Sequence, residues 1–250
     1  MSPQVLLLLL AGACFALGQR LPDNFDPVRA EREGRELTAE LLSQVPTGNY
    51  TNVGIMEIRK RKEDPVEMPI RFTVLVSGNR WISHYEALHT DSNDAIDSLV
   101  IIHDPGKPTR YFRGTPGDLE NASPLSATEV ATWKFAGSDY WACDLGLEFL
   151  RWPVQRLLKK ELRSSQSCNV LESINTNTPA GGYARVVSWL DIDTGGVVFA
   201  ESYDVNRKRI KEFAPKAFKK VDGEWQLEEM RIEDLKDKSK STILFEVGNE

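Results

Sequence analysis

The chain has 250 residues, 41% of them hydrophobic and 27% charged, and its formal net charge is −6 at pH 7. This acidic balance argues against nucleic-acid binding, which needs a net basic face to neutralise phosphates. Beyond the amino terminus no apolar run approaches the roughly 20 residues that span a bilayer. The composition is that of a globular protein with room for one full-sized domain, or at most two small ones.

The amino terminus opens with an apolar run from Val5 to Leu17, and Arg20 is the first charged side chain. The run is too short for a membrane span but fits the hydrophobic region of a signal peptide, with small residues at Ala16 and Gly18 before the cleavage point. We therefore expect residues 1–18 to be removed on export, leaving a single domain over residues 19–250. Cys14 leaves an alternative open, in which it is the lipid-modified residue that anchors a bacterial lipoprotein.

Two cysteines follow this signal, Cys143 and Cys168. In an oxidising compartment an isolated pair of cysteines usually forms a disulfide, so we expect these two to be bridged. A catalytic thiol is the weaker alternative, because no histidine lies near either cysteine in sequence.

The first predicted element of the mature chain is a helix over residues 27–45. Asp26 is suited to the N-cap and Pro27 to the first helical position, whereas Gly34 weakens the middle of the helix. Its apolar stripe at helical spacing consists of Val28, Leu37, Thr38, Leu41, Leu42 and Val45.

From Tyr50 onward, alternating apolar residues and short turns predict strands. The expected strands are residues 50–59, 70–76, 80–88, 99–103, 109–112, 157–162, 168–174, 183–192, 197–205, 209–218, 225–232 and 241–247. The stretch between residues 115 and 153 is less regular: Ser126 and Glu129 form a possible capping box for a short helix, and a second short helix is expected over residues 144–151. Strands joined by such short turns form an antiparallel meander with one buried face.

Searches for catalytic or metal-binding patterns give little. His84 and His89 leave opposite faces of one strand and His103 lies elsewhere, so a shared metal is not expected. The Asp191-x-Asp193-x-Gly195 pattern begins like a calcium loop, but a strand follows at once, which favours a hairpin turn. No nucleophile elbow and no phosphate-binding glycine loop are present. We therefore predict no cofactor, no metal and no enzymatic activity.

The C-terminal half is similar to the bacterial LolA-like family of outer-membrane lipoprotein-sorting proteins. The segments that carry this resemblance are residues 137–140, 144–153, 189–195, 200–204, 218–225, 230–232 and 242–246. They are turns and packing positions rather than catalytic motifs, so they identify a fold better than an activity. The resemblance implies an α+β protein, mainly antiparallel β, in which a curved incomplete β-barrel (a half-barrel) carries helices over its concave face.

The family's function implies a periplasmic carrier that holds an acyl chain or a lipidated polypeptide in an apolar cavity, extending to outer-membrane lipoprotein sorting with envelope proteins as partners. Candidate residues that line such a cavity, or simply fill a core, are Val187, Trp189, Phe199, Tyr203, Trp225, Leu227, Ile243 and Phe245. The alternative function is a non-catalytic interaction or sensor domain of the cell envelope, which would use the same fold with a filled core.

Overall fold

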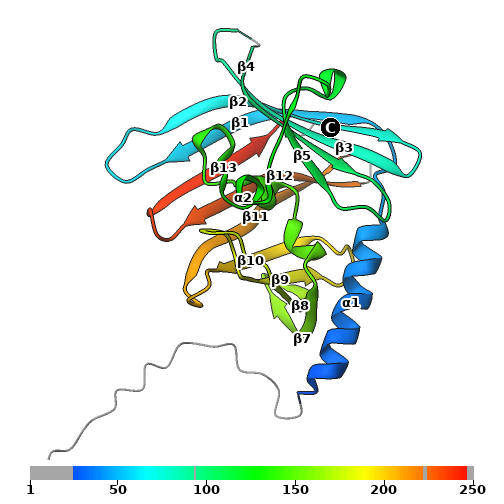
Figure 1. The fold of residues 1–250 in the computed structure, drawn as a ribbon. Helices are drawn as coiled ribbons and strands as arrows, with labels where there is room; N and C mark the ends of the chain where they lie inside the picture. Colours follow the sequence, from blue (N-terminus) through cyan, green and yellow to red (C-terminus); the bar gives the residue numbers. More distant parts are fainter. Residues whose placement is uncertain (1–24, 93, 222–223, 247–250) are drawn as a thin grey trace, which may run out of the picture.

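The computed structural model describes residues 25–92, 94–221 and 224–246, with side chains outside residues 216–226 (Figure 1). The predicted signal peptide, residues 1–18, and the alternative lipid anchor at Cys14 lie outside the described residues. None of the described helices is both long enough and apolar enough to cross a membrane.

Within the described residues the fold consists of thirteen antiparallel strands, one helix of 17 residues and several short helices. In chain order the strands are β1 (Tyr50–Arg59), β2 (Val66–Ser77), β3 (Arg80–Leu88), β4 (Ala95–His103), β5 (Arg110–Arg113), β6 (Ser123–Pro124), β7 (Val154–Arg163), β8 (Gln166–Ile174), β9 (Arg185–Asp191), β10 (Val197–Tyr203), β11 (Arg209–Val221), β12 (Glu224–Asp234) and β13 (Ser239–Phe245). Each predicted strand has a counterpart among these. Only the two-residue strand β6 was not expected.

The strands form one sheet in the order β6-β5-β4-β3-β2-β1-β13-β12-β11-β10-β9-β8-β7. This order consists of two meanders, β1 to β6 and β7 to β13, joined by the pairing of β1 with β13. The two edges of the sheet, β6 and β7, are therefore consecutive in sequence. The sheet is strongly curved and does not close (Figure 1), which confirms the predicted half-barrel. We call the gap between the two edges the seam.

The chain between the two edge strands, residues 125–153, must cross the seam, and we call it the linker. It contains the helices α2 (Ala127–Thr132) and α3 (Ala142–Leu145) and the 3-10 turns η2 (Phe135–Gly137) and η3 (Glu148–Arg151). Another 3-10 turn, η1 (Pro116–Asp118), precedes it. The linker lies inside the curve of the sheet (Figure 1), so the face that it covers is called the inner face. Helices over the concave face were predicted, and this placement confirms them.

Local chemistry explains how the linker is shaped. Ser126 accepts a hydrogen bond from the Glu129 backbone N–H while the Glu129 carboxylate accepts one from the Ser126 N–H, which confirms the predicted capping box. The prediction of one continuous helix over residues 144–151 is wrong. Leu147 has a left-handed backbone with φ of 46°, and this divides the segment into α3 and η3.

Helix α1 (Pro27–Ser43) begins as predicted, with Asp26 accepting hydrogen bonds at the N-cap and Pro27 in the first turn. It runs beside the edge strand β7. Gly34 explains the close approach, because a Cβ there would lie 2.6 Å from the β7 backbone at Gln155. Leu37, Leu41 and Leu42 of the predicted stripe pack against a buried cluster on the inner face, whereas Val28 is 80% exposed and does not belong to that buried stripe. We call this the inner cluster; its buried members are Trp141, Cys143, Phe149, Leu150, Leu171, Tyr183, Val186, Leu190 and Ala200.

Candidate functional site

The inner face over β1 to β4, β12 and β13 is a packed core. Phe135 and Tyr140 of the linker are fully buried among strand residues of β1 to β4, β12 and β13. The Tyr140 hydroxyl donates a hydrogen bond to the Met230 carbonyl oxygen at 2.9 Å. The linker side chains therefore occupy the space that an open half-barrel would offer to a ligand in this region.

A buried aspartate ties the linker to the sheet. Asp139 is 1% exposed, and its carboxylate accepts hydrogen bonds from the hydroxyls of Ser239 at 2.6 Å and Ser241 at 2.8 Å. The Ser241 hydroxyl also accepts the Asp139 backbone N–H at 2.8 Å. Because each carboxylate oxygen accepts a hydrogen bond, these bonds offset the cost of burying the charge.

A buried lysine adds a second polar anchor on the inner face. The Lys211 ammonium, 1% exposed, lies 3.3 Å from an Asp144 carboxylate oxygen and 3.6 Å from the centre of the Trp141 ring. The hydroxyl of Tyr183 donates to the same carboxylate at 2.9 Å. Burial lowers the pKa of Lys211, and the Asp144 charge opposes that shift.

Sequence reasoning missed Lys211 and Asp144 as a pair. One signal was available: Lys211 and Phe213 are two residues apart in β11, so they share the inner face. A charged side chain on the same strand face as a buried aromatic side chain indicates that a buried group of opposite charge lies nearby. Its identity, 67 residues earlier in the chain, depends on the path of the linker.

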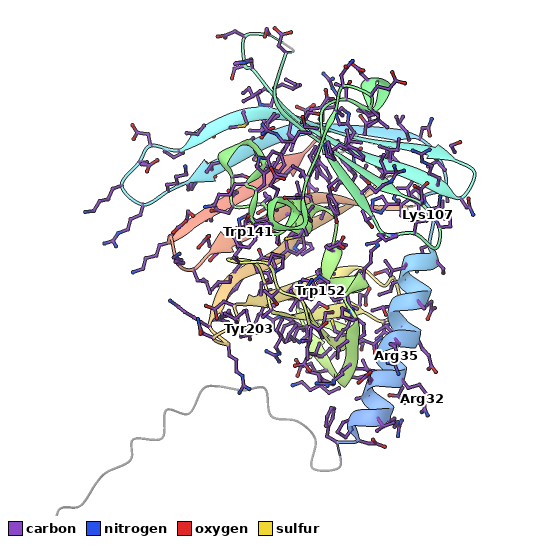
Figure 2. The ribbon with its side chains drawn as sticks, viewed as in Figure 1. Arg32, Arg35, Lys107, Trp141, Trp152 and Tyr203 are labelled. Carbon is purple, nitrogen blue, oxygen red and sulfur yellow. The ribbon has the colours of Figure 1, made fainter. Side chains whose placement is uncertain are left out.

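Two adjoining cavities lie at the seam. A cavity of about 860 Å³ separates α1 from the β4–β5 turn and from η3. Its walls combine apolar groups with a few charged ones; they include Arg35, Ala39, Leu42, Val45, Trp81, His103, Asp104, Lys107, Thr109, Glu148, Leu150, Arg151 and Trp152. In Figure 2 Arg35 lies on α1, Lys107 lies near the end of this helix, and Trp152 lies further inside the molecule.

A second cavity of about 500 Å³ adjoins the first, and Thr109, Glu148 and Trp152 line both. It lies between β5, α2 and the loop that joins β8 to β9. Its lining is largely apolar or aromatic and includes Tyr111, Phe112, Leu125, Val130, Ala131, Cys143, Pro179 and Tyr183. A third, narrow pocket of about 20 Å³ continues inward past Cys143 and Tyr183. Together they form a cleft, which we call the seam cleft.

A tyrosine and a glutamate form the polar centre of the seam cleft. The Tyr111 hydroxyl donates to the Glu148 carboxylate at 2.6 Å. Burial raises the pKa of Glu148, and the hydrogen bond from Tyr111 acts in the opposite direction. Gly146 makes this contact possible, because a Cβ there would lie 2.2 Å from the Tyr111 hydroxyl oxygen.

A histidine and an arginine lie at the other end of the first cavity. The His103 ring stacks on Trp81 with 4.5 Å between centroids, and its Nδ1 accepts a hydrogen bond from the Arg151 guanidinium at 3.3 Å. Burial lowers the pKa of His103 to about 4, and the charge of Arg151 acts in the same direction. His103 is therefore a neutral ring near pH 7.

The candidate cavity residues from the sequence divide between the two faces of the sheet. Leu227, Ile243 and Phe245 belong to the inner core beneath the linker. A separate cluster on the opposite, outer face contains Val187, Trp189, Phe199 and Tyr203. The side chain of Trp225 lies outside the described residues, although its backbone belongs to β12. None of the seven with described side chains lines the first or the second cavity of the seam cleft, and a role for any of them in ligand binding stays a prediction.

The predicted disulfide is corrected by the structure. Cys143 and Cys168 are both free and buried. Cys143 lies in α3 and packs in the inner cluster with Trp141 and Phe149, whereas Cys168 lies in β8 and packs on the outer face with Trp189. The sheet therefore lies between the two thiols, and burial raises the pKa of each.

No group of three or more metal-ligating side chains occurs within residues 25–92, 94–221 and 224–246. The Asp191 segment forms a turn, in which the Thr194 hydroxyl donates to the Asp191 carboxylate at 2.8 Å and the Gly195 N–H donates to its carbonyl at 2.9 Å. The hairpin interpretation of this segment is confirmed.

Three solved structures resemble this fold. A DUF1329 family protein from Desulfovibrio piger has a TM-score of 0.69 and 19% identity, covering 90% of this chain and 96% of its own. A putative outer membrane lipoprotein-sorting protein domain from Vibrio parahaemolyticus has a TM-score of 0.69 and 19% identity, with coverages of 88% and 95%. A LolA superfamily protein from Nitrosomonas europaea has a TM-score of 0.57 and 17% identity, with coverages of 87% and 92%.

Among curated proteins none matches the chain. One family model, described as an uncharacterized protein, matches residues 123–247, half of the chain. This region begins at β6 and ends just after β13, so it includes the linker with Asp139 and Asp144 and the whole second meander. The chain therefore belongs to the family that this model describes, and its fold is that of the LolA-like proteins.

Proposed function

We propose that the protein is a carrier of the periplasm that binds an acyl chain of a lipid or of a lipidated polypeptide in the seam cleft, extending to lipoprotein sorting at the outer membrane. The observation that carries this proposal is the pair of adjoining, mainly apolar cavities on a half-barrel of LolA-like fold. A fold neighbour from Vibrio parahaemolyticus is described as a putative lipoprotein-sorting domain, which supports the same class of ligand.

The dimensions of the seam cleft suit an acyl chain. Cavities of about 860 and 500 Å³ fall in the range of roughly 300–1,000 Å³ that small-molecule sites occupy. Each methylene group moved from water into the cleft contributes about 0.8 kcal/mol. Burial of the methylene groups of an acyl chain of ordinary length therefore supplies enough free energy for stable binding.

The polar groups of the cleft support binding rather than turnover. The Glu148 carboxylate is engaged by Tyr111 and the His103 ring by Arg151. The Cys143 thiol lines the second cavity, but burial raises its pKa, so it is a poor nucleophile. These groups satisfy one another and leave no activated nucleophile beside a free base.

Native mass spectrometry of the protein purified from periplasm without detergent tests this proposal. The expected result is an added mass that extracts as lipid or lipopeptide, together with competition between that ligand and a fluorescent fatty acid. Ala39→Trp, on the cleft side of α1, places an indole in the first cavity and should abolish probe binding. Val28→Trp is the matched control on the same helix, since Val28 is 80% exposed and outside the cleft. Probe affinity that is the same in both variants and in the wild type would refute the placement of the site.

A second candidate function, a non-catalytic interaction domain of the envelope, is favoured by a different observation. Phe135 and Tyr140 are fully buried in the inner core, and the outer face carries exposed apolar side chains at Val53, Ile55 and Leu244. Ile55 and Leu244 face each other across the pairing of β1 with β13. A protein that carries no lipid and refuses the fatty-acid probe, yet co-purifies stoichiometrically with an envelope protein, would support this function instead.

A further inference from the structure

Three basic side chains from three separate elements meet at the first cavity. Arg35 comes from α1, Lys107 from the β4–β5 turn, and Arg151 from η3. We call them the basic rim. The protein as a whole carries a net charge of −6, so three cations around the first cavity run against the overall balance.

The acidic side chains of the same cavity already have partners. Asp104 is engaged by Arg110 at 2.8 Å and by Arg80 at 3.3 Å. Glu148 accepts the hydroxyl of Tyr111, and burial raises its pKa. The charge of Asp104 is shared among Arg80, Arg110 and Lys107. Glu148 interacts with Arg151 while burial raises its pKa, so the two acidic groups offset only part of the charge of the basic rim.

Two of the three rim cations lack a carboxylate partner. Arg35 is paired with Glu31 at 2.6 Å, and both are partly exposed. Neither Lys107 nor Arg151 has a carboxylate oxygen within 4.0 Å in the part of the chain that the structure describes. Arg151 is held instead by two neutral acceptors, Nδ1 of His103 at 3.3 Å and the Gly146 carbonyl oxygen at 3.4 Å. Its guanidinium lines the cavity and is held by neutral acceptors, while Glu148 offsets its charge only from beyond 4.0 Å.

An apolar wall completes the site. Leu42, Leu150 and Trp152 lie beside the basic rim, and Trp152 also borders the second cavity. A ligand that satisfies both features has an anionic head and an apolar tail. Arginine is well suited to the head, because its planar fork binds phosphate oxygens in pairs.

We propose that the seam cleft is selective for anionic amphiphiles, with the phosphate headgroup of a lipid on the basic rim and its acyl chain running past Trp152 into the second cavity. This inference rests on the proposed carrier function and adds the class of headgroup to it. The headgroup contributes selectivity, whereas the acyl chain contributes most of the affinity.

The test compares two lysolipids with the same palmitoyl chain, lysophosphatidylglycerol and lysophosphatidylcholine, by isothermal titration calorimetry below their micelle concentrations. The wild type should bind the anionic lipid about tenfold more tightly, and Lys107→Gln or Arg151→Gln should each reduce this ratio about two- to fivefold. Arg35→Gln should reduce the ratio as well. Arg32→Gln is its matched control, because Arg32 lies on the same helix (Figure 2) and does not line the cavity. Raising ionic strength from about 0.1 M to 1 M should weaken the ratio in the wild type, since the Debye length shortens from about 10 Å to 3 Å.

The outcomes separate the two proposals. Equal affinity of the wild type for both lysolipids would overturn the selectivity and leave the carrier function standing, as would a ratio that no rim variant changes. Failure of both lysolipids to bind would refute the carrier function itself, and the selectivity with it. Melting curves identify any rim variant that fails to fold, and Lys107, in an exposed turn, carries the test if Arg151→Gln unfolds.

Discussion

The strongest prediction about pH concerns His103, which is buried at 9% exposure between Trp81 and Arg151. Its pKa falls from 6.5 to about 4 in the folded protein because burial disfavours the imidazolium. The unfolded chain binds a proton near pH 6.5, whereas the folded chain does not until about pH 4. In that window the unfolded state holds more protons, so the free energy of unfolding decreases as the pH falls.

The size of this effect follows from the shift. One pKa unit corresponds to 1.36 kcal/mol, so the full window is worth about 3 kcal/mol. His103→Gln removes the titration while keeping an acceptor for Arg151. Its free energy of unfolding should therefore lose less between pH 7.5 and pH 4.5 than that of the wild type.

Urea unfolding followed by circular dichroism at several pH values measures both proteins. Subtracting the two curves cancels the contributions of His84 and of the surface carboxylates, which both chains share. The loss of ring stacking gives an offset that does not depend on pH. A wild-type-minus-variant difference that stays constant from pH 7.5 to pH 4.5 would refute the burial of a neutral His103.

The remaining predictions concern packing, a buried ion pair and the thiols. Gly34→Ala should destabilise by about 1–3 kcal/mol, despite the higher helix propensity of alanine, because the new methyl group meets the β7 backbone; an unchanged or higher melting temperature would show that α1 does not pack so closely. Tyr140→Phe should cost about 1 kcal/mol in urea unfolding for the lost hydrogen bond to a β12 carbonyl, and no measurable change would argue against that bond. Asp144→Asn should cost about 3–5 kcal/mol because it leaves the buried lysine ammonium unpaired; a loss below 1 kcal/mol would mean that this pair is solvated. A chain lacking residues 1–18 should show two titratable thiols in denaturant without reductant, from Cys143 and Cys168, and a count of zero would restore the disulfide.

The strands and most of their turns could be predicted from the sequence because their signals are local. Alternation in residues 70–76 and the Ser77-Gly78-Asn79 turn specify one hairpin without reference to the rest of the chain, and β2 and β3 pair there. The N-cap at Asp26 and the capping box at Ser126 are equally local. Gly34 was taken only as a weak point of the helix, whereas its packing role depends on Gln155, which lies 121 residues later in β7.

The faces of the second meander could not be assigned from alternation. Alternation states that Val187 and Trp189 share a face, but not whether that face is inner or outer, because both faces of β9 are buried. Phe25 packs on the outer cluster and supplies cover there. The same ambiguity produced the disulfide prediction. An oxidising compartment and a single pair of cysteines give no information on which side of the sheet each cysteine lies.

The seam cleft lay beyond sequence reasoning for a topological reason. Its walls come from α1, the β4–β5 turn and the linker, segments that become neighbours only when the two edge strands of the sheet approach each other. Trp152 and Arg151 were noted only as parts of the resemblance to the LolA-like family. Their common position beside the first cavity depends on the break at Leu147 that separates α3 from η3.

The most direct test of the central claim is to locate a bound acyl chain. A fatty acid with a diazirine in its chain, cross-linked by light to the intact protein and mapped by peptide mass spectrometry, should label α1, η3 or the residues around Leu125 and Val130 that line the seam cleft. Excess palmitate should suppress the label, and Ala39→Trp should reduce it while Val28→Trp does not. Labelling confined to the outer face of β1, β2 and β13, or labelling that palmitate does not suppress, would contradict the account.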